Sequence, residues 1–288
     1  MGIIETLLDV RKKRKQQKYE KNKLKKIAFF SEKHGVKEWV NGEVKPSTNN
    51  YKRLSIFDKE SQRIIKGIYE DLARYSSITG ILFHDDAFLT DFEDVSNQAL
   101  DYYRSQGLNF NSIEELRSES MIDVWTDVKT QALIDFTDEL TELIARHNGS
   151  VITARNIYAR PILNPEAKRW FSQSLASFVN HYDVTAVMAM PFMEQAKDSS
   201  QWLNDLMDKI EQQTGNDKVV IELQTVDWRN QTPIDTEVLL HHINLLLQRG
   251  FIHFAYYPDD FINNHPALKK IISGMSLNTF PQQEAVYE

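Results

Sequence analysis

From residue 51 onward, short apolar runs alternate with longer segments whose apolar residues recur every three or four positions. Residues 59–74 are of the second kind, with Ile64, Ile68 and Leu72 on one side, which is the spacing of an amphipathic helix. Residues 80–83, Gly-Ile-Leu-Phe, are of the first kind and predict a buried strand. The same reasoning predicts strands at residues 80–83, 150–154, 185–190, 218–224 and 251–256, and helices at residues 59–74, 123–146, 165–179, 199–214, 235–249 and 266–274.

Strands that alternate with helices predict a parallel sheet, because two consecutive parallel strands need a crossover connection, which is usually a helix. The predicted strands are nearly continuous in apolar residues, as expected when a sheet is covered on its faces. A chain of 288 residues has an ordinary size for one α/β barrel. We therefore expect an α/β fold, a (β/α) barrel of the TIM type, whose functional residues lie at the C-terminal ends of its strands.

The first 50 residues do not follow this rhythm. Between residues 11 and 26 there are ten Lys or Arg residues and one Glu. This stretch and the apolar residues after it predict an amphipathic helix over residues 11–34, followed by a weak strand candidate at 36–40 and a loop at 41–50. We therefore expect two parts: an atypical N-terminal segment, residues 1–50, and a barrel domain, residues 51–288.

Composition excludes several classes of protein. The formal net charge of -7 argues against a nucleic-acid partner for the whole chain, so we interpret the basic stretch as a solvated helix rather than an arm for nucleic acid or anionic lipid. The absence of cysteine excludes disulfides and thiolate zinc sites. No apolar run approaches the ~20 residues of a membrane span. Residues 1–10 lack the charge order of a signal peptide, so the chain as written is not expected to be exported.

Carboxylates occur where predicted strands end. Asp85 and Asp86 follow the strand at 80–83, and Glu222 lies near the end of the strand at 218–224. Because the C-terminal ends of parallel strands meet at one edge of a sheet, we expect these side chains to lie close together. Neighbouring carboxyl groups can hold their pKa values apart, so that one is protonated while the other is ionised. Hydrolysis of a glycosidic bond needs that division of roles.

Other chemistries are less well supported. His84 beside Asp85 and Asp86 could begin a metal site of the His/carboxylate type, but the remaining histidines offer no clear partners. We therefore expect no metal and no other cofactor. The chain has no Gly-x-Ser-x-Gly turn and no Gly-rich phosphate loop, which argues against a serine hydrolase and against a nucleotide-binding enzyme.

Aromatic residues also follow several apolar runs. Sugar rings present apolar C–H faces that can stack on aromatic rings, so aromatic residues at strand ends suit a saccharide groove. Each of them taken alone is more often a packing residue, but together with the carboxylates they favour carbohydrate. Arginines near strand ends could bind substrate or form ion pairs. These residues are Tyr158, Trp228, Tyr256 and Tyr257, and Arg155, Arg160 and Arg229, whereas Trp125, Trp170 and Trp202 lie in predicted helices and are expected to be structural.

Five segments resemble one family in the same order. They are residues 80–87 (GILFHDDA), 154–165 (ARNIYARPILNP), 182–194 (YDVTAVMAMPFME), 222–228 (ELQTVDW) and 256–260 (YYPDD). They look like the C-terminal glycoside hydrolase domain of bacterial poly-β-1,6-N-acetyl-D-glucosamine N-deacetylases (PgaB-like proteins), over about residues 51–264. The resemblance implies a barrel that hydrolyses partially de-N-acetylated poly-N-acetylglucosamine, a biofilm exopolysaccharide, in endo fashion.

The resemblance and the strand ends together define a candidate site. We expect Asp86, with Asp85 or Glu222, to form the acid and the nucleophile-or-base pair, and Asp91 to help recognise an ammonium-bearing sugar. The expected partner is this polysaccharide and not a nucleic acid. The residues expected to bind the substrate are Asp91, His84, Arg155, Tyr158, Glu194, Trp228, Tyr256, Tyr257, Asp259 and Asp260.

The chain departs from the family pattern in three ways. The metal-dependent deacetylase domain is absent, so we do not expect deacetylation. We expect the barrel to lack its first strands, which should precede residue 51. Family members enter the periplasm and are often outer-membrane lipoproteins, whereas this chain shows no such signal. A barrel without its first strands has open sheet edges, which favour self-association. The alternative function is therefore a truncated, catalytically inactive saccharide-binding module or a fragment of the N-deacetylase protein.

Overall fold

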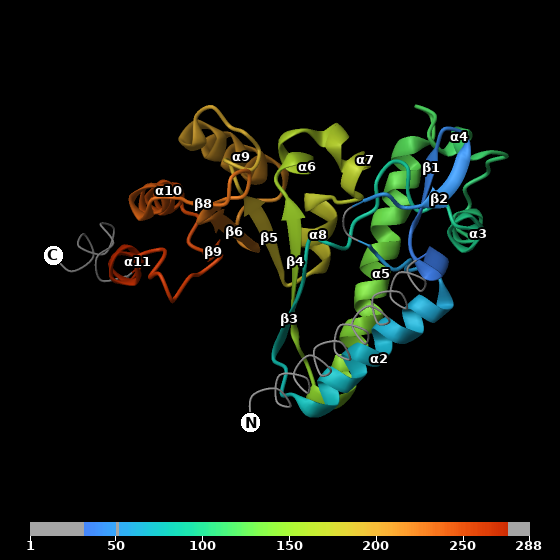
Figure 1. The fold of residues 1–288 in the computed structure, drawn as a ribbon, viewed down its shortest axis with the longest axis horizontal. Helices are drawn as coiled ribbons and strands as arrows, with labels where there is room; N and C mark the ends of the chain where they lie inside the picture. The colour runs from blue at the N-terminus through green and yellow to red at the C-terminus, as the bar shows by residue number, and fades with distance from the viewer. Residues whose placement is uncertain (1–31, 50–51, 276–288) are drawn as a thin grey trace, which may run out of the picture. The chain divides into compact units, whose positions relative to one another are not determined.

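The computed structural model describes residues 32–49 and 52–275 (Figure 1). These residues form two compact units. The first contains residues 32–72 and Leu89–Val128, and the second contains Ala73–Phe88 and the residues from 129 onward. The helix expected at residues 11–34 falls, except for its last three residues, outside the described residues. No helix in the described part of the chain is long and apolar enough to cross a membrane.

The second unit is built on a curled parallel sheet. Its strands are β3 (Gly80–Phe83), β4 (Ile152–Tyr158), β5 (Val184–Ala189), β6 (Val219–Gln224) and β9 (Phe254–Tyr257), and they lie side by side in that order. Each strand pairs in parallel with the next one. Strands that follow one another in chain order are typical of a barrel. The predicted α/β fold is thus confirmed, as a partial TIM-like barrel with five strands in residues 32–49 and 52–275.

The helices of this unit lie between its strands or after the last one. They are α6 (Arg160–Leu163), the 3-10 turn η1 (Pro165–Ala167), α7 (Lys168–Phe171), α8 (Leu175–His181), α9 (Ser199–Gln213), α10 (Thr236–Gln248), α11 (Leu268–Met275) and the C-terminal part of α5 (Ile122–Asn148). The longer ones begin at side-chain caps: Asp198 accepts hydrogen bonds from Ser200 N and Gln201 N at the start of α9, and Asp235 accepts one from Glu237 N at the start of α10.

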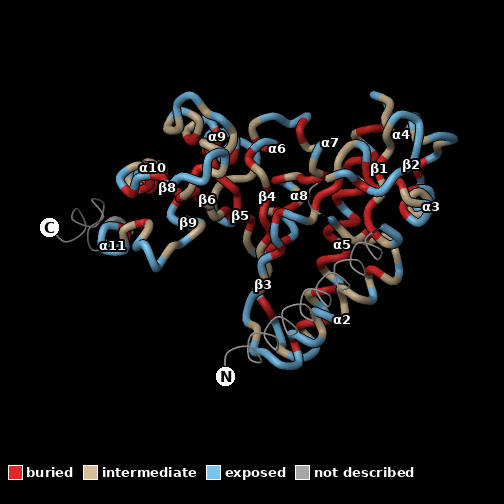
Figure 2. The backbone as a smooth tube through the Cα atoms, in the orientation of Figure 1, coloured by how far each residue is buried: buried red, intermediate tan, exposed pale blue. Residues whose placement is uncertain are grey.

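The two faces of the sheet differ in composition. Side chains alternate between the faces along a strand, and one face carries Ile157, Val187 and Ile221, which are fully buried. Helices α8 and α10 pack against β5 and β6. The opposite face carries Asn156 and Glu222. Figure 2 shows that the central strands are mostly buried, whereas β3 and β9, at the two ends of the strand order, have more exposed residues. Self-association through these end strands stays a prediction.

The first unit has a small antiparallel hairpin and a core of its own. The hairpin pairs β1 (Lys37–Val40) with β2 (Glu43–Pro46), and the helices are α3 (Asn97–Ser105), α4 (Ile113–Leu116), most of α2 (Lys59–Tyr75) and the start of α5. The strand candidate at 36–40 is confirmed as β1. The loop expected at 41–50 is wrong for residues 43–46, because Asn41 and Gly42 have positive φ angles of 52° and 81° and form a tight hairpin turn.

Two buried acids fasten the hairpin to the rest of this unit. Glu93 accepts hydrogen bonds from Arg53 Nη2 (2.7 Å) and from Ser47 Oγ, and Asp94 accepts one from Ser55 Oγ (2.5 Å). Burial raises the pKa of Asp94. Burial also acts to raise the pKa of Glu93, but Arg53 and Ser47 outweigh it, so that the pKa of Glu93 is lowered. Both acids therefore have a structural role, although they follow β3 closely in the sequence, as the catalytic candidates Asp85 and Asp86 do.

Three predicted boundaries were wrong for local reasons. Strand β4 continues to Tyr158 rather than ending at residue 154, because its polar residues have buried partners. The single helix expected at 165–179 is broken at Ser172, which has a left-handed φ of 49°, and restarts where Ser174 caps α8. Strand β9 begins at Phe254 rather than 251, because the N–H of Phe251 bonds to Leu246 O and so belongs to the end of α10.

The buried imidazole of His242 in α10 makes stability depend on pH. Its Nε2 lies 3.0 Å from Ser199 Oγ. Burial, aided by His241, lowers the pKa of His242 from 6.5 to about 4. The unfolded chain takes up this proton below pH 6.5 and the folded chain only near pH 4. The free energy of unfolding should therefore fall by about 3 kcal/mol as the pH drops through this window.

Urea denaturation of the wild type and of His242→Gln between pH 7.5 and pH 4 checks this. Glutamine can keep the hydrogen bond to Ser199 but does not titrate, so the variant should lose about 3 kcal/mol less over this range. The exposed neighbour gives a control, because His241→Gln should keep most of the wild-type dependence. An equal pH dependence in His242→Gln and the wild type would contradict the assignment.

Candidate active site

Several of the candidate site residues of the second unit lie at the C-terminal ends of its strands. The segment 84–88 leaves β3 there, Tyr158 ends β4, and Glu222 lies near the end of β6. The strand pairing aligns Tyr158 with Met188 of β5, and Met188 with Glu222, so the three residues form one row across the sheet. Parallel pairing thus delivers side chains from distant parts of the chain to one edge, as expected for a barrel enzyme.

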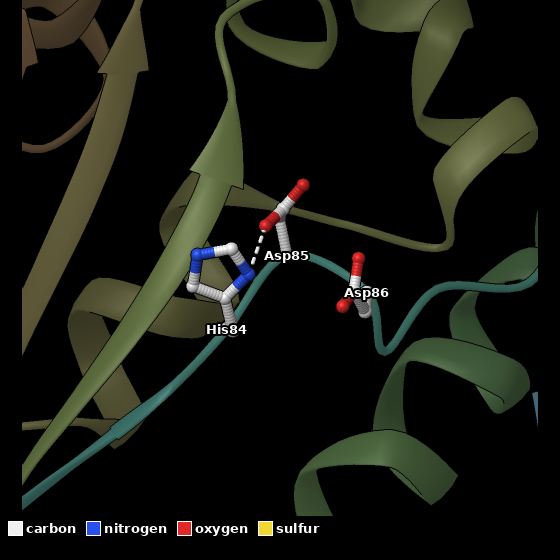
Figure 3. A group of neighbouring side chains, drawn as sticks. All are labelled: His84, Asp85 and Asp86. Carbon is white, nitrogen blue, oxygen red and sulfur yellow. Dashed lines mark ion pairs between the residues drawn. The ribbon is translucent and has the colours of Figure 1, made fainter. Parts of the chain in front are cut away.

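Asp85 is held by neighbours on both of its oxygens. The hydroxyl of Tyr158 donates a hydrogen bond of 2.6 Å to Oδ2, and Nδ1 of His84 forms an ion pair with Oδ1. The residue is only 7% exposed. Figure 3 shows the carboxylate of Asp85 against the ring of His84, and the carboxylate of Asp86 apart from this pair. Asp86 itself is exposed. The adjacent carboxylates therefore have different environments.

Glu222 has the environment of a proton donor. Its Oε2 accepts a hydrogen bond of 2.7 Å from Nδ2 of Asn156. Burial raises the pKa of Glu222, and the charge of Asp85 adds to the rise, whereas the hydrogen bond from Asn156 and the charge of His84 oppose it. A raised pKa keeps a larger fraction of a carboxylic acid protonated near neutral pH. The charge of Asp85 thus acts on Glu222 across the ends of the strands.

The segment after β3 could also offer metal ligands. His84, Asp85 and Asp86 each present one ligand atom, and these atoms lie within 4.8 Å of one another. Nδ1 of His84 is paired with Asp85, and the other oxygen of Asp85 accepts from Tyr158. His84 and Asp85 are therefore already paired, whereas Asp86 is exposed, and this group suits acid–base catalysis better than a dedicated metal centre. The expectation of no metal stays a prediction.

Aromatic residues lie at the other end of the sheet. A short hairpin of β7 (Val226–Asp227) and β8 (Thr232–Pro233) follows β6 and carries Trp228. The rings of Trp228 and Tyr257 are 6.0 Å apart and tilted by 32°. Tyr257 is 52% exposed, so it can offer a ring face to a ligand. Arg229 pairs with Asp227 at 2.7 Å and lowers the pKa of that acid.

Tyr256 and the two acids after β9 have separate surroundings. The pKa of the Tyr256 phenol is raised by burial and by the charge of Asp259. Asp260 bonds within its own loop: its Oδ1 accepts hydrogen bonds from Ile262 N (3.1 Å) and Asn263 N (3.0 Å). The hydrogen bonds from Asn263 lower the pKa of Asp260. Asp260 therefore shapes this loop, while Asp259 remains exposed.

Two further candidates belong to ion pairs. Glu194, after β5, accepts a hydrogen bond of 3.1 Å from Nε of Arg160, whose guanidinium carbon lies 6.0 Å from the ring centroid of Trp170. Trp170 was expected to be structural but is 42% exposed. Asp91 belongs to the first unit, where Arg117 Nη2 lies 3.6 Å from its Oδ2.

Arg155 lies on the packed face of the sheet. It is 1% exposed, and its Nη2 donates a hydrogen bond of 2.5 Å to Ala87 O. The substrate contact expected for it from the sequence does not fit this burial. Asn156 and Tyr158, which lie further along β4 on the other face, instead bond to Glu222 and Asp85.

Sequence reasoning missed three buried amides. Asn156 contacts Glu222; Gln173 Oε1 accepts from Tyr158 N (3.0 Å); and Gln224 Oε1 accepts from Phe192 N (2.9 Å). The only available signal was an amide inside an apolar strand, at Asn156 and Gln224. A buried amide needs hydrogen-bond partners, but sequence does not say which ones.

A family described as "Hypothetical glycosyl hydrolase family 13" (GHL13) matches residues 12–257. The chain is also similar to the poly-beta-1,6-N-acetyl-D-glucosamine N-deacetylase of Escherichia coli (strain K12), with 37% identity over 258 residues. That match covers 86% of this chain and 38% of the relative, and the protein of the same name from Escherichia coli O157:H7 gives the same values. The chain thus spans well under half the length of these relatives.

Solved structures are similar in fold. The PgaB (BpsB) glycoside hydrolase domain from Bordetella bronchiseptica superposes with a TM-score of 0.78 and 40% identity, over 84% of this chain and 69% of that chain. The beta-galactosidase of the psychrophilic Marinomonas ef1 has a TM-score of 0.52 and 12% identity, over 77% of this chain and 40% of that one. The second likeness concerns the fold alone.

Removal of the amide beside Glu222 gives a direct test of this electrostatic arrangement. Asn156→Leu deletes the hydrogen bond that opposes the rise in the pKa of Glu222, so this pKa should rise further. Carbon-13 NMR titration of the Glu222 carboxyl carbon measures it. An unchanged or lower pKa would show that Asn156 does not stabilise the ionised form.

Proposed function

The chain belongs to the family described as hypothetical glycosyl hydrolase family 13, and from this premise we propose that it cleaves partially de-N-acetylated poly-β-1,6-N-acetyl-D-glucosamine in endo fashion. The family and the likeness to the PgaB glycoside hydrolase domain make the chain a glycoside hydrolase domain. The substrate and the roles of individual residues belong to the proposal. Its main support is the contrast between Glu222, whose pKa is raised, and the paired carboxylate of Asp85.

Glu222 is the proposed general acid. Cleavage of a glycosidic bond requires a proton on the departing oxygen, and an acid whose pKa is raised can supply it near neutral pH. Asn156 stabilises the carboxylate of Glu222 that results, because its amide already donates a hydrogen bond to Oε2. The hydrogen bond therefore orients Glu222 before the proton transfer and stabilises its ionised form afterwards.

The Asp85–Asp86 pair supplies the second carboxylate in this proposal. It acts as nucleophile, or as base toward a water molecule, on the opposite side of the sugar ring. Asp85 is oriented by Tyr158 and His84, whereas Asp86 is more accessible to a ligand. Both therefore remain candidates for the second role, and separate variants decide between them.

The substrate assignment rests on the relatives and on charge. The curated relatives are named for poly-beta-1,6-N-acetyl-D-glucosamine. De-N-acetylated sugars carry ammonium groups, which an acidic protein attracts, and this chain has a formal charge of -7. Trp228 and Tyr257 offer adjacent rings for the apolar faces of sugars. Together these properties favour a cationic polysaccharide.

A saccharide-binding module without catalysis is the second candidate. The observation that favours it is the sheet of the described residues, whose five strands are fewer than the eight of a closed TIM barrel. Both candidates predict binding to partially de-N-acetylated polymer, but only the hydrolase shortens it. Mass spectrometry of the oligosaccharides released during incubation with the polymer separates the two.

Charge-neutral variants of the three carboxylates test the catalytic proposal. Glu222→Gln should lower cleavage by 10²–10⁴-fold, the usual contribution of acid–base assistance, while polymer binding remains measurable. Asp86→Asn is expected to abolish cleavage nearly completely. Asp85→Asn shows whether Asp85 shares the role of Asp86 as the second carboxylate. Asp217→Asn is the control, because Asp217 is exposed just before β6, at the end away from Glu222. Normal cleavage by both Glu222→Gln and Asp86→Asn would refute the assignment.

Asp91 is proposed to recognise the ammonium-bearing sugar. Asp91→Asn should weaken binding to the de-N-acetylated polymer by roughly twofold to fivefold, as expected for one exposed charge pair, and should change binding to the fully acetylated polymer less. Calorimetric titration with both polymers measures the difference. Asp101→Asn, which removes another acid of the first unit paired with an arginine, serves as control. Equal losses for the two polymers would disprove ammonium recognition.

A further inference from the structure

Arg155 is a buried cation in the middle of β4. Its Cα pairs with that of Phe83 in β3 and that of Thr185 in β5. The side chain is 1% exposed on the packed face of the sheet. A buried charge is costly unless it has hydrogen-bond partners, and an apolar residue would fill the same space without that cost. The contacts of Arg155 therefore indicate what the charge contributes.

The guanidinium group of Arg155 reaches the segment that carries the catalytic carboxylates. Nη2 donates a hydrogen bond of 2.5 Å to Ala87 O, and the guanidinium carbon lies 5.4 Å from the ring centroid of Phe178. Ala87 directly follows Asp86. The cation thus holds the main chain next to the carboxylate pair, and a main-chain carbonyl is a contact that no change of side chain at position 87 removes.

Tyr158, three residues further along β4, holds the same segment from the other face. Its hydroxyl donates to Asp85 Oδ2 at 2.6 Å, and its ring centroid lies 6.3 Å from that of Phe88. Gln173 fixes the main chain of Tyr158 by accepting from its N–H at 3.0 Å. Two residues of β4 therefore hold segment 85–88. Tyr158 contacts Asp85 and Phe88, and Arg155 bonds to Ala87.

We propose that Arg155 is a positioning residue for hydrolysis: through the Ala87 carbonyl it fixes segment 85–87 at the end of β4. This fixes the distance of Asp85 and Asp86 from Glu222. The inference rests on the proposed function of these carboxylates, and it assigns Arg155 no contact with the substrate. Positioning matters because a displacement of about 1 Å at a reacting group can cost about 10²-fold in rate.

Arginine suits this position better than lysine. Its planar group of five N–H donors can bond to the carbonyl while its face lies near the ring of Phe178, and it is less strongly hydrated than an ammonium group. Arg155→Lys keeps the charge but offers a single, compact donor group. Arg155→Met keeps most of the volume and removes both the charge and the donors.

The test compares these two variants with Thr185→Val. Thr185, in β5, is paired with Arg155 of β4 and is also fully buried. Its Oγ1 has no hydrogen-bond partner among the described residues. The replacement of Thr185 thus perturbs the same layer of the core without touching segment 85–87. The measurements are kcat and KM on partially de-N-acetylated polymer, and hydrogen exchange of the backbone amides by mass spectrometry.

Arg155→Met should lower kcat by about 100-fold and change KM little, because the sugar contacts remain. Its amides at residues 84–88 should exchange faster, while those of β5 and β6 exchange as in the wild type. Arg155→Lys should recover part of both kcat and protection. Thr185→Val should leave both unchanged. This pattern separates positioning from a general loss of stability, which would speed exchange throughout the unit.

Wild-type exchange at residues 84–88 in a folded Arg155→Met variant would overturn the inference, as would faster exchange throughout the sheet. Where Arg155→Met does not fold, Arg155→Lys decides: wild-type kcat and wild-type exchange together overturn it. Hydrogen exchange does not depend on activity. If the wild type fails to cleave the polymer, the proposed function fails, and the exchange data still show whether Arg155 holds the segment.

Discussion

Parallel pairing of consecutive strands is the constraint on which the rest of this structure depends. In a parallel sheet every strand ends at the same edge. Residues as far apart in the chain as Asp85, Tyr158 and Glu222 are therefore brought together without any loop having to cross the molecule. The main-chain hydrogen bonds of the sheet fix their spacing. The site depends on the register of β4 against β5 and of β5 against β6.

Because side chains alternate along each strand, one face of the sheet packs against helices and the other carries the carboxylates. In β4, the side chains of Arg155 and Ile157 go to the packed face, and those of Asn156 and Tyr158 go to the face that holds the carboxylates. A shift of the strand by one residue would exchange these roles. One short strand thus supplies both the support of segment 85–87 and the hydrogen bonds to two catalytic candidates.

Burial acts on charged groups throughout the chain, and local partners decide its outcome. It raises the pKa of Glu222 and Asp94 and lowers that of His242, because the charged form is disfavoured away from water. At Glu93 the contacts from Arg53 and Ser47 reverse the outcome. The raised pKa at Glu222 supports its proposed role as general acid, whereas Glu93 and Asp94 serve to hold the first unit together.

The sequence alone determined the class of fold and the approximate positions of the five parallel strands, because both follow from local patterns of apolar residues, although the bounds of β4 and β9 were wrong. It also placed Asp85, Asp86 and Glu222 at strand ends. It could not determine that Arg155 lies on the face opposite the carboxylates or that Asn156 donates to Glu222, because both depend on which face of β4 is packed and on what the neighbouring strands present. Such assignments need the pairing of distant strands, and pairing is a property of the tertiary structure.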